Sequence, residues 1–101
     1  MFTGPDNKGP HYHPTDLVAE RGHVLNMDFG VKVDDYVSDM QRTFYLLDEG
    51  ETKAPEDVMK GFNTIVDAIE MARAVLKPGV LPVEVDKVAR EHIVAQGYDE
   101  F

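Results

Sequence analysis

The pattern of apolar and polar positions divides the chain into a loop-like beginning, an extended middle and a helical end. Residues 1–22 are punctuated by Gly and Pro with Asp, Asn and Thr between them, a composition typical of loops. Residues 23–47 are dominated by β-branched, aromatic and other apolar side chains in two runs, which predicts two strands. Asp34 and Asp35 separate the two runs, so we expect a β-hairpin with a short turn at these residues.

Two helices are predicted after the hairpin, over residues 55–77 and 82–97, because apolar side chains recur there at spacings of three and four. Pro78 and Gly79 end the first helix, and Gly97 ends the second. We expect the apolar stripes to be core faces, at Val58, Phe62, Ile65, Val66, Ile69, Ala72 and Leu76 on the first helix and at Val85, Val88, Ala89 and Ile93 on the second. The element order predicts an α+β fold. Because two strands alone are marginally stable in water, we also expect further strands from another segment or another copy.

Composition and charge exclude several classes of protein. The chain has 101 residues, which is enough for one domain or part of one, and 43% of them are hydrophobic, which is enough for a packed core. With 19 acidic and 10 basic residues the net charge is −9, which disfavours binding to nucleic acid. Cysteine is absent, so disulfides and thiolate metal sites are excluded. No signal peptide and no membrane-spanning apolar run is present in the sequence, and we expect a cytoplasmic protein.

The hairpin brings two acidic residues together on one face. With a two-residue turn at 34–35, Asp28 lies opposite Gln41 and Gly30 lies opposite Asp39. Directly opposed side chains share a face of an antiparallel pair, so Asp28 and Asp39 become diagonal neighbours roughly 7 Å apart. An odd-length turn would reverse the faces and separate them.

Two ionised carboxylates at that distance repel each other and need a compensating charge. Lys32 or Arg42 could supply it, and so could a divalent cation held between the carboxylates. Oxygen ligands suit hard or borderline divalent ions, and Gly30 would leave room for one beside Asp39. Asp28 and Asp39 are therefore candidate metal ligands, but two ligands do not complete a site.

Four motifs in the same order carry a resemblance to a known family. Met27–Gly30 followed by Tyr36–Phe44 resembles the pita-bread metallopeptidases, whose pattern is Asp-(apolar)-Gly and then Tyr-x-x-Asp-x-x-Arg-Thr. Residues 4–16 are similar to the Gly-Pro-Asn and Pro-His-Tyr-x-Pro-Thr motifs of that family, and residues 76–86 to its Lys-Pro-Gly and Glu-Val-Asp motifs. The superfamily contains Xaa-Pro dipeptidases (prolidases), Xaa-Pro aminopeptidases, methionine aminopeptidases and creatinases. Gln41 stands where the family most often has Thr.

The resemblance implies roles for three residues. Asp28 and Asp39 correspond to the first two ligands of a dinuclear site, with Asp39 bridging both ions, and His11 corresponds to a histidine that contacts the substrate. The ions would be Mn, Co or Zn, and the reaction would be metal-assisted hydrolysis of a peptide substrate next to proline (Xaa-Pro). The family's remaining ligands, a histidine and two glutamates, are expected after Phe101. Residues 1–101 are therefore expected to be part of a pita-bread catalytic domain, without its N-terminal helices and its C-terminal metal-binding half.

Two alternatives to this interpretation stay open. One is a truncated, non-catalytic relative that self-associates through unpaired strand edges and exposed apolar area. The other is an acidic α+β domain whose Asp28–Asp39 pair is merely solvated and holds no metal. We expect a homo-oligomer, and we expect the isolated chain to be inactive as a peptidase and to bind metal weakly.

Overall fold

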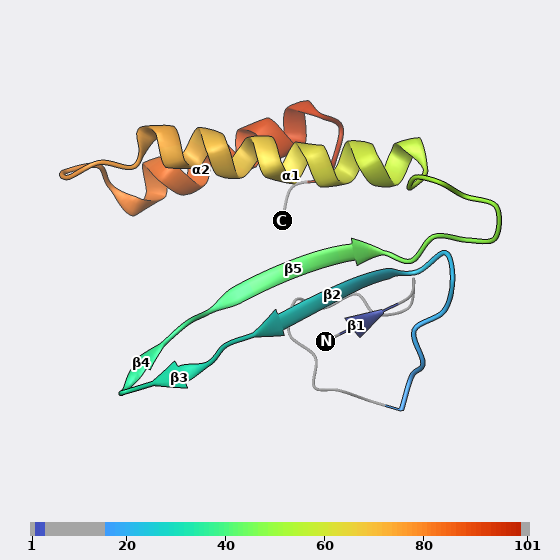
Figure 1. Cartoon of the computed structure of the whole chain (residues 1–101). Coiled ribbons are helices and arrows are strands. Elements are labelled where there is room, and N and C mark those ends of the chain that lie inside the picture. Colours follow the sequence, from blue (N-terminus) through green and yellow to red (C-terminus); the bar gives the residue numbers. More distant parts are fainter. Residues whose placement is uncertain (1, 4–15, 100–101) are drawn as a thin grey trace. The chain divides into compact units, whose positions relative to one another are not determined.

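The structure of the chain is a computed structural model that describes residues 2–3 and 16–99 (Figure 1). It divides into two compact units, Met1–Ala54 and Pro55–Phe101. The first unit contains the strands and the second contains the helices. This confirms the α+β class predicted from the sequence.

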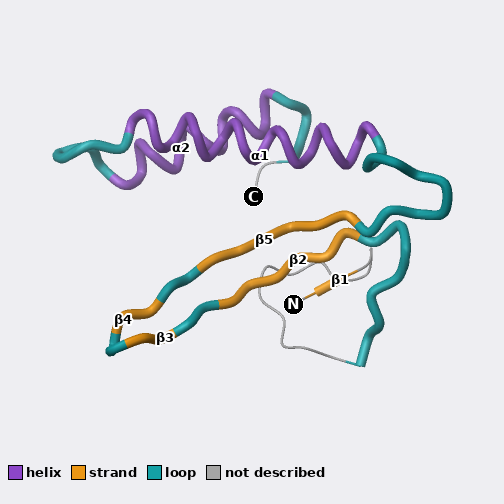
Figure 2. The backbone as a smooth tube through the Cα atoms, viewed as in Figure 1, coloured by secondary structure: helices purple, strands orange, loops and turns teal. Residues whose placement is uncertain are grey.

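The strands of the first unit form a three-stranded and a two-stranded antiparallel sheet, with the order β1-β2-β5 in the larger one. Figure 2 shows β2 leading into β3 and β4 returning into β5, so the two sheets are successive parts of one long hairpin. The bounds are Phe2–Thr3 for β1, Val24–Phe29 for β2, Lys32–Val33 for β3, Tyr36–Val37 for β4 and Met40–Tyr45 for β5.

The predicted two-residue turn is present at the tip of the hairpin. Asp34 and Asp35 have φ values of 47° and 67°, which places both in the left-handed region, and Val33 pairs with Tyr36 across them. Tight hairpin turns need positive φ at both central residues, and Asp tolerates that region better than most residues. The turn therefore sets the even register that the sequence predicted.

Two features of the first unit differ from the prediction. The strands are not continuous over 23–47, because Gly30–Val31 and Ser38–Asp39 interrupt the ladder at the same level. The segment predicted as loop, residues 1–22, contains the short strand β1, which pairs with β2. A third strand thus comes from the chain itself, although the sequence pattern gave it no distinct signal.

The second unit is a pair of helices, α1 (Glu56–Val75) and α2 (Pro82–Ala95), whose bounds lie close to those predicted. Acidic residues in the first turn of each helix complement the positive end of the helix dipole. Gly79 and Gly97, with φ of 92° and 90°, adopt the left-handed conformation beyond the helix ends. Neither helix is long and apolar enough to cross a membrane, within the part of the chain that the structure describes.

Small side chains form the contact face of α1. Thr64 and Ala68 are the buried residues of this helix, and Gly61 and Ala72 beside them are half-buried. The Thr64 hydroxyl donates to the Lys60 carbonyl at 2.9 Å, so its polar group is satisfied within the helix. The predicted stripe of α2 is half-buried throughout, which agrees with a face directed at α1.

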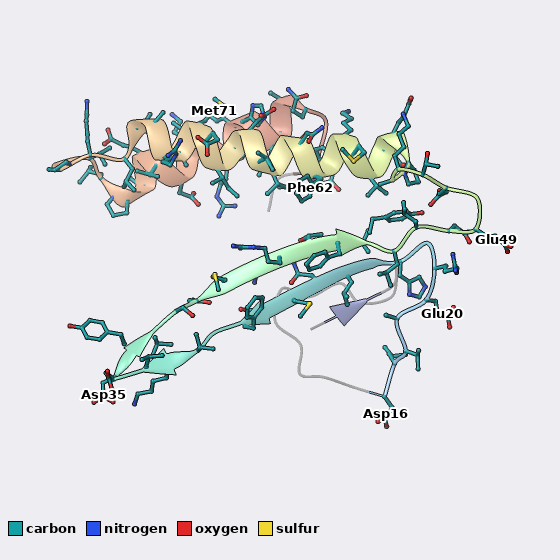
Figure 3. The ribbon with its side chains drawn as sticks, in the orientation of Figure 1. Asp16, Glu20, Asp35, Glu49, Phe62 and Met71 are labelled. Atoms are coloured by element: carbon teal, nitrogen blue, oxygen red, sulfur yellow. The ribbon has the colours of Figure 1, made fainter. Side chains whose placement is uncertain are left out.

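The prediction that the apolar stripe of α1 is a core face is wrong for most of its length within this unit. Phe62, Ile65, Val66 and Ile69 are 41–59% exposed, and Leu76 is 65% exposed. The cause is that α2 packs against the row of small residues, where the two backbones can approach closely. Figure 3 shows Phe62 and Met71 on different sides of α1, so both of these large side chains lie outside the contact face.

The residues that follow α2 contact the first part of α1. Lys60 Nζ donates to the Gln96 carbonyl at 3.1 Å and lies 5.6 Å from the centre of the Tyr98 ring. A Cβ atom at Gly61 would lie 3.3 Å from the Tyr98 hydroxyl, so a glycine keeps this approach open. The glycine that weakens α1 by sequence propensity therefore has a packing reason.

Candidate metal centre

The polar face of the hairpin carries Asp28 with its cross-strand neighbour. Asp28 on β2 pairs with Gln41 on β5, as the predicted register required, and Gln41 Nε2 donates to Asp28 Oδ2 at 3.2 Å. Two rungs further along, on the same face, Asn26 pairs with Thr43, and Asn26 Nδ2 donates to the Thr43 hydroxyl at 3.1 Å. Because alternate residues of a strand share a face, these two polar rungs lie side by side.

The opposite face of the same strands is mainly apolar. Its cross-strand pairs are Leu25 with Phe44, Met27 with Arg42 and Phe29 with Met40. Arg42 is the cationic residue on this face, and its guanidinium forms hydrogen bonds within β5. It donates to the Gln41 carbonyl at 2.8 Å and to Met40 Sδ at 3.7 Å. Polar and apolar side chains are therefore separated between the two faces of the hairpin.

Asp39 lies in the interruption of the ladder, directly before β5. Two residues interrupt each strand, Gly30–Val31 on one and Ser38–Asp39 on the other, so the pairing has the same offset on both sides of the gap. Ser38 N donates to the Val31 carbonyl at 3.0 Å, and Val31 N donates to the Ser38 hydroxyl at 3.0 Å. The serine side chain thus replaces a backbone acceptor where the regular ladder stops.

Gly30 has a different role from the one predicted. The expectation was that its missing side chain leaves room for an ion beside Asp39. In the structure a Cβ atom at Gly30 would collide with the Ser38 carbonyl oxygen, so that space is filled by backbone. The glycine therefore determines how closely the peptide that leads into Asp39 can approach β2.

The candidate residues fit a metal only in part. Asp28 and Asp39 both have exposed side chains, and carboxylate oxygens suit hard divalent ions. Lys32, one of the two possible compensating cations, forms an ion pair with Asp35 at 2.7 Å. Among the described residues there is no group of three or more His, Cys, Asp or Glu side chains that could hold an ion. His11, the predicted substrate contact, lies outside the described residues.

Sequence reasoning missed two structural details of this site. It placed Gln41 opposite Asp28 but assigned no hydrogen bond to the pair, although an amide donor opposite a carboxylate is a usable signal. It also missed Ser38, whose hydroxyl closes the interrupted ladder. The second detail depends on where the strand breaks, which periodicity alone does not indicate.

Comparisons with known proteins agree with this architecture. The sequence profile of Metallopeptidase family M24 matches residues 1–101. An uncharacterised peptidase of Bacillus subtilis is 33% identical over 93 residues, which are 91% of this chain and 25% of that protein. The X-Pro aminopeptidase of Thermotoga maritima is 34% identical with a TM-score of 0.80, covering 91% of this chain and 25% of that one. Prolidase from Thermococcus sibiricus is 30% identical with a TM-score of 0.83, covering 95% of this chain and 25% of that one. The chain thus spans about a quarter of the length of these relatives.

Proposed function

Because the chain belongs to metallopeptidase family M24, we propose that it supplies Asp28 and Asp39 as two ligands of a dinuclear metal centre in a peptidase that hydrolyses Xaa-Pro bonds. The remaining ligands lie outside these 101 residues. This division of the site agrees with the relatives, which are about four times as long as the chain. The 101 residues alone are expected to be inactive.

The observation that carries the proposal is the register of the hairpin. Asp28 pairs with Gln41, and the gap before β5 has the same number of residues as the gap after β2. Asp39 comes two residues before Gln41, so an alternating pleat that continued across the gap would put both carboxylates on the polar face. This arrangement supports a pair of oxygen donors aimed at a shared ion.

Each residue has a separate task in the proposed reaction. When bound, the two ions would lower the pKa of a water molecule and so supply the nucleophile for the peptide carbonyl. Asp28 and Asp39 would hold the ions and offset their positive charge. His11 contacts the substrate near the scissile carbonyl and helps to stabilise charge on its oxygen. The names of the two solved relatives, an X-Pro aminopeptidase and a prolidase, support proline-containing substrates.

The test is metal binding and hydrolysis by the full-length protein that contains this chain. Calorimetric titration with Mn²⁺ is expected to give two bound ions, and Asp39→Asn is expected to lower affinity at least a hundredfold because it removes the shared ligand. Activity on an Xaa-Pro dipeptide is expected to disappear with it, and an Xaa-Ala dipeptide is expected to be a poor substrate of the parent.

Asp35→Asn is the matched control, because Asp35 is an exposed aspartate of the same hairpin (Figure 3). It is expected to leave the Mn²⁺ affinity within twofold of the parent. Equal losses in the Asp35→Asn and Asp39→Asn proteins would contradict a specific ligand role for Asp39. A parent protein that binds none of Mn²⁺, Co²⁺ and Zn²⁺ would contradict the proposal as a whole.

A second candidate function, self-association of the 101-residue chain, is favoured by the exposed apolar side chains of α1. Phe62 and Ile69 are 47% and 59% exposed in the described part of the chain. Contiguous apolar surface of this kind is a common site of association. Sedimentation at several concentrations tests this candidate, and a monomer at all concentrations would exclude it.

A further inference from the structure

We propose that Gln41 is a positioning residue, whose side-chain amide holds the Asp28 carboxylate in the orientation that receives a divalent cation. This inference rests on the proposed function, because it assumes that Asp28 is a ligand. It adds that the geometry of this ligand is set from the neighbouring strand.

The contact is direct and built into the register. Gln41 lies on the neighbouring strand β5, directly opposite Asp28, and its Nε2 atom is 3.2 Å from Asp28 Oδ2. Both side chains are exposed, so packing alone restricts their rotamers little. A hydrogen bond across the strands limits the rotation of the carboxylate before an ion arrives. Ordering the ligand in advance reduces the entropy that metal binding would otherwise cost.

The chemical nature of the donor suits this task. A carboxylate has two oxygens with about four acceptor positions, and the amide donor at Oδ2 occupies one of them. Gln41 is neutral, so its hydrogen bond does not neutralise the negative charge of Asp28. A lysine or arginine at the same position would neutralise that charge and compete with the metal.

Gln41 is itself held in place. The Arg42 guanidinium donates to the backbone carbonyl of Gln41 at 2.8 Å on the next residue of β5. Two rungs away on the same face, Asn26 Nδ2 donates to the Thr43 hydroxyl at 3.1 Å, so a second polar pair lies beside the first. The amide thus extends from a strand that pairs with β2 on both sides of position 41, through Met40 and Arg42.

The experiment compares Gln41→Met with Thr43→Val in the full-length protein, using Mn²⁺ as the ligand. Methionine keeps the length of glutamine but has no donor, whereas Thr43→Val removes the hydroxyl of the next polar pair on the same face. Partners of metal ligands commonly change metal affinity by about 10–100-fold, and for this exposed pair we expect the low end, about tenfold weaker Mn²⁺ binding in Gln41→Met. Thr43→Val is expected to stay within twofold of the parent.

Two further readouts separate positioning from a general structural effect. The melting temperature of the metal-free Gln41→Met protein is expected to equal that of the parent. Its hydrolysis rate is expected to fall about tenfold at limiting Mn²⁺ and to return to within twofold at saturating Mn²⁺. If Gln41→Met folds poorly, Gln41→Ala gives the same test with the same expected loss of affinity.

The failures of the two proposals are distinguishable. If Asp28→Asn abolishes Mn²⁺ binding while Gln41→Met stays within twofold of the parent, the positioning role is wrong and the ligand role stands. If Asp28→Asn has no effect on Mn²⁺ binding, both are wrong. A rate that stays tenfold low at saturating Mn²⁺ would also overturn the positioning role, because the defect would then not lie in metal binding.

Discussion

The two units of the chain treat their acidic side chains differently. On the helices, acidic residues have cationic neighbours one turn away, in the pairs Glu70–Arg73, Asp86–Arg90 and Lys87–Glu91. On the hairpin, Asp35 is likewise paired with Lys32, whereas Asp28 accepts a hydrogen bond from the neutral amide of Gln41. An amide donor does not neutralise a carboxylate, whereas a lysine or arginine partner does. This difference between Asp28 and the ion-paired carboxylates supports the ligand role proposed for Asp28.

The units also differ in how close contacts are made. In the hairpin a close contact is made by backbone, because the Ser38 carbonyl lies where a Cβ atom at Gly30 would be. In the helix pair it is made by the small side chains of Thr64 and Ala68, while larger apolar residues of α1 stay exposed. In both units small residues therefore lie at close contacts. Substitutions at these positions should cost more than substitutions of the large side chains.

Gly30→Ala is expected to have the largest effect on stability. The new methyl group would collide with the Ser38 carbonyl, which belongs to the peptide before Asp39. Overpacking typically costs about 1–3 kcal/mol, and a clash with backbone in a hairpin should reach about 3 kcal/mol. Denaturant titration of the protein measures this loss, and Mn²⁺ affinity should fall with it.

Gly50→Ala is the matched control for Gly30→Ala. Gly50 has a φ of 84°, but a Cβ atom there would meet no atom within 4 Å. The expected cost is the conformational strain alone, about 1 kcal/mol. Equal costs at the two glycines would show that the Gly30 contact relaxes easily.

Ala68→Leu tests the helix pair in the same way, with a smaller expected effect. Ala68 is 3% exposed, so three additional carbons must displace α2, and we expect a loss of about 2 kcal/mol in the free energy of unfolding. Ile69→Ser, at a neighbouring residue that is 59% exposed, should change it by less than about 1 kcal/mol. A larger loss for Ile69→Ser than for Ala68→Leu would mean that the apolar stripe is covered in solution.

These positions also show what the sequence could and could not predict. The turn at Asp34 and Asp35 fixed the register, because an even turn determines the face of every later residue. The opposition of Asp28 and Gln41 followed from that single feature. The ligand pair itself remains a prediction, since it depends on how Asp39 is oriented across the gap.

Two parts of the fold were beyond sequence reasoning for physical reasons. The break at Ser38 depends on a hydroxyl replacing a backbone acceptor. A single serine in the sequence does not indicate whether its hydroxyl will accept this hydrogen bond. The contact face of α1 was assigned to its large apolar residues because the periodicity argument considers how hydrophobic the residues are and not how small they are. Close packing of helices instead favoured Thr64 and Ala68, whose small size lets α2 approach.

Lys60→Met tests how much the contacts of Lys60 with the residues after α2 contribute to the stability of the helix pair. It removes the hydrogen bond to the Gln96 carbonyl and the contact with the Tyr98 ring, while keeping the aliphatic stem. Together these exposed interactions should be worth about 1 kcal/mol. Lys87→Met, which removes only an exposed ion pair of 3.6 Å with Glu91, is the control and should cost less than about 0.5 kcal/mol. Thermal unfolding of both proteins would show whether the two lysines differ in this order.

Asp35→Gly should have the smallest effect on the free energy of unfolding. The sign of the change shows which is larger at the tip of the hairpin, the backbone strain at Asp35 or its ion pair with Lys32. Glycine adopts the φ of 67° without steric strain, which favours the variant, but the substitution also removes the ion pair of Lys32 with Asp35 at 2.7 Å. Both partners are more than half exposed, so the ion pair is worth about 0–0.5 kcal/mol. Relief of strain should exceed it slightly, and we expect a gain of about 0.5 kcal/mol in denaturant titration. Lys32→Met removes the ion pair alone, and a larger loss there than this gain would show that the charge pair, and not the backbone, holds the turn.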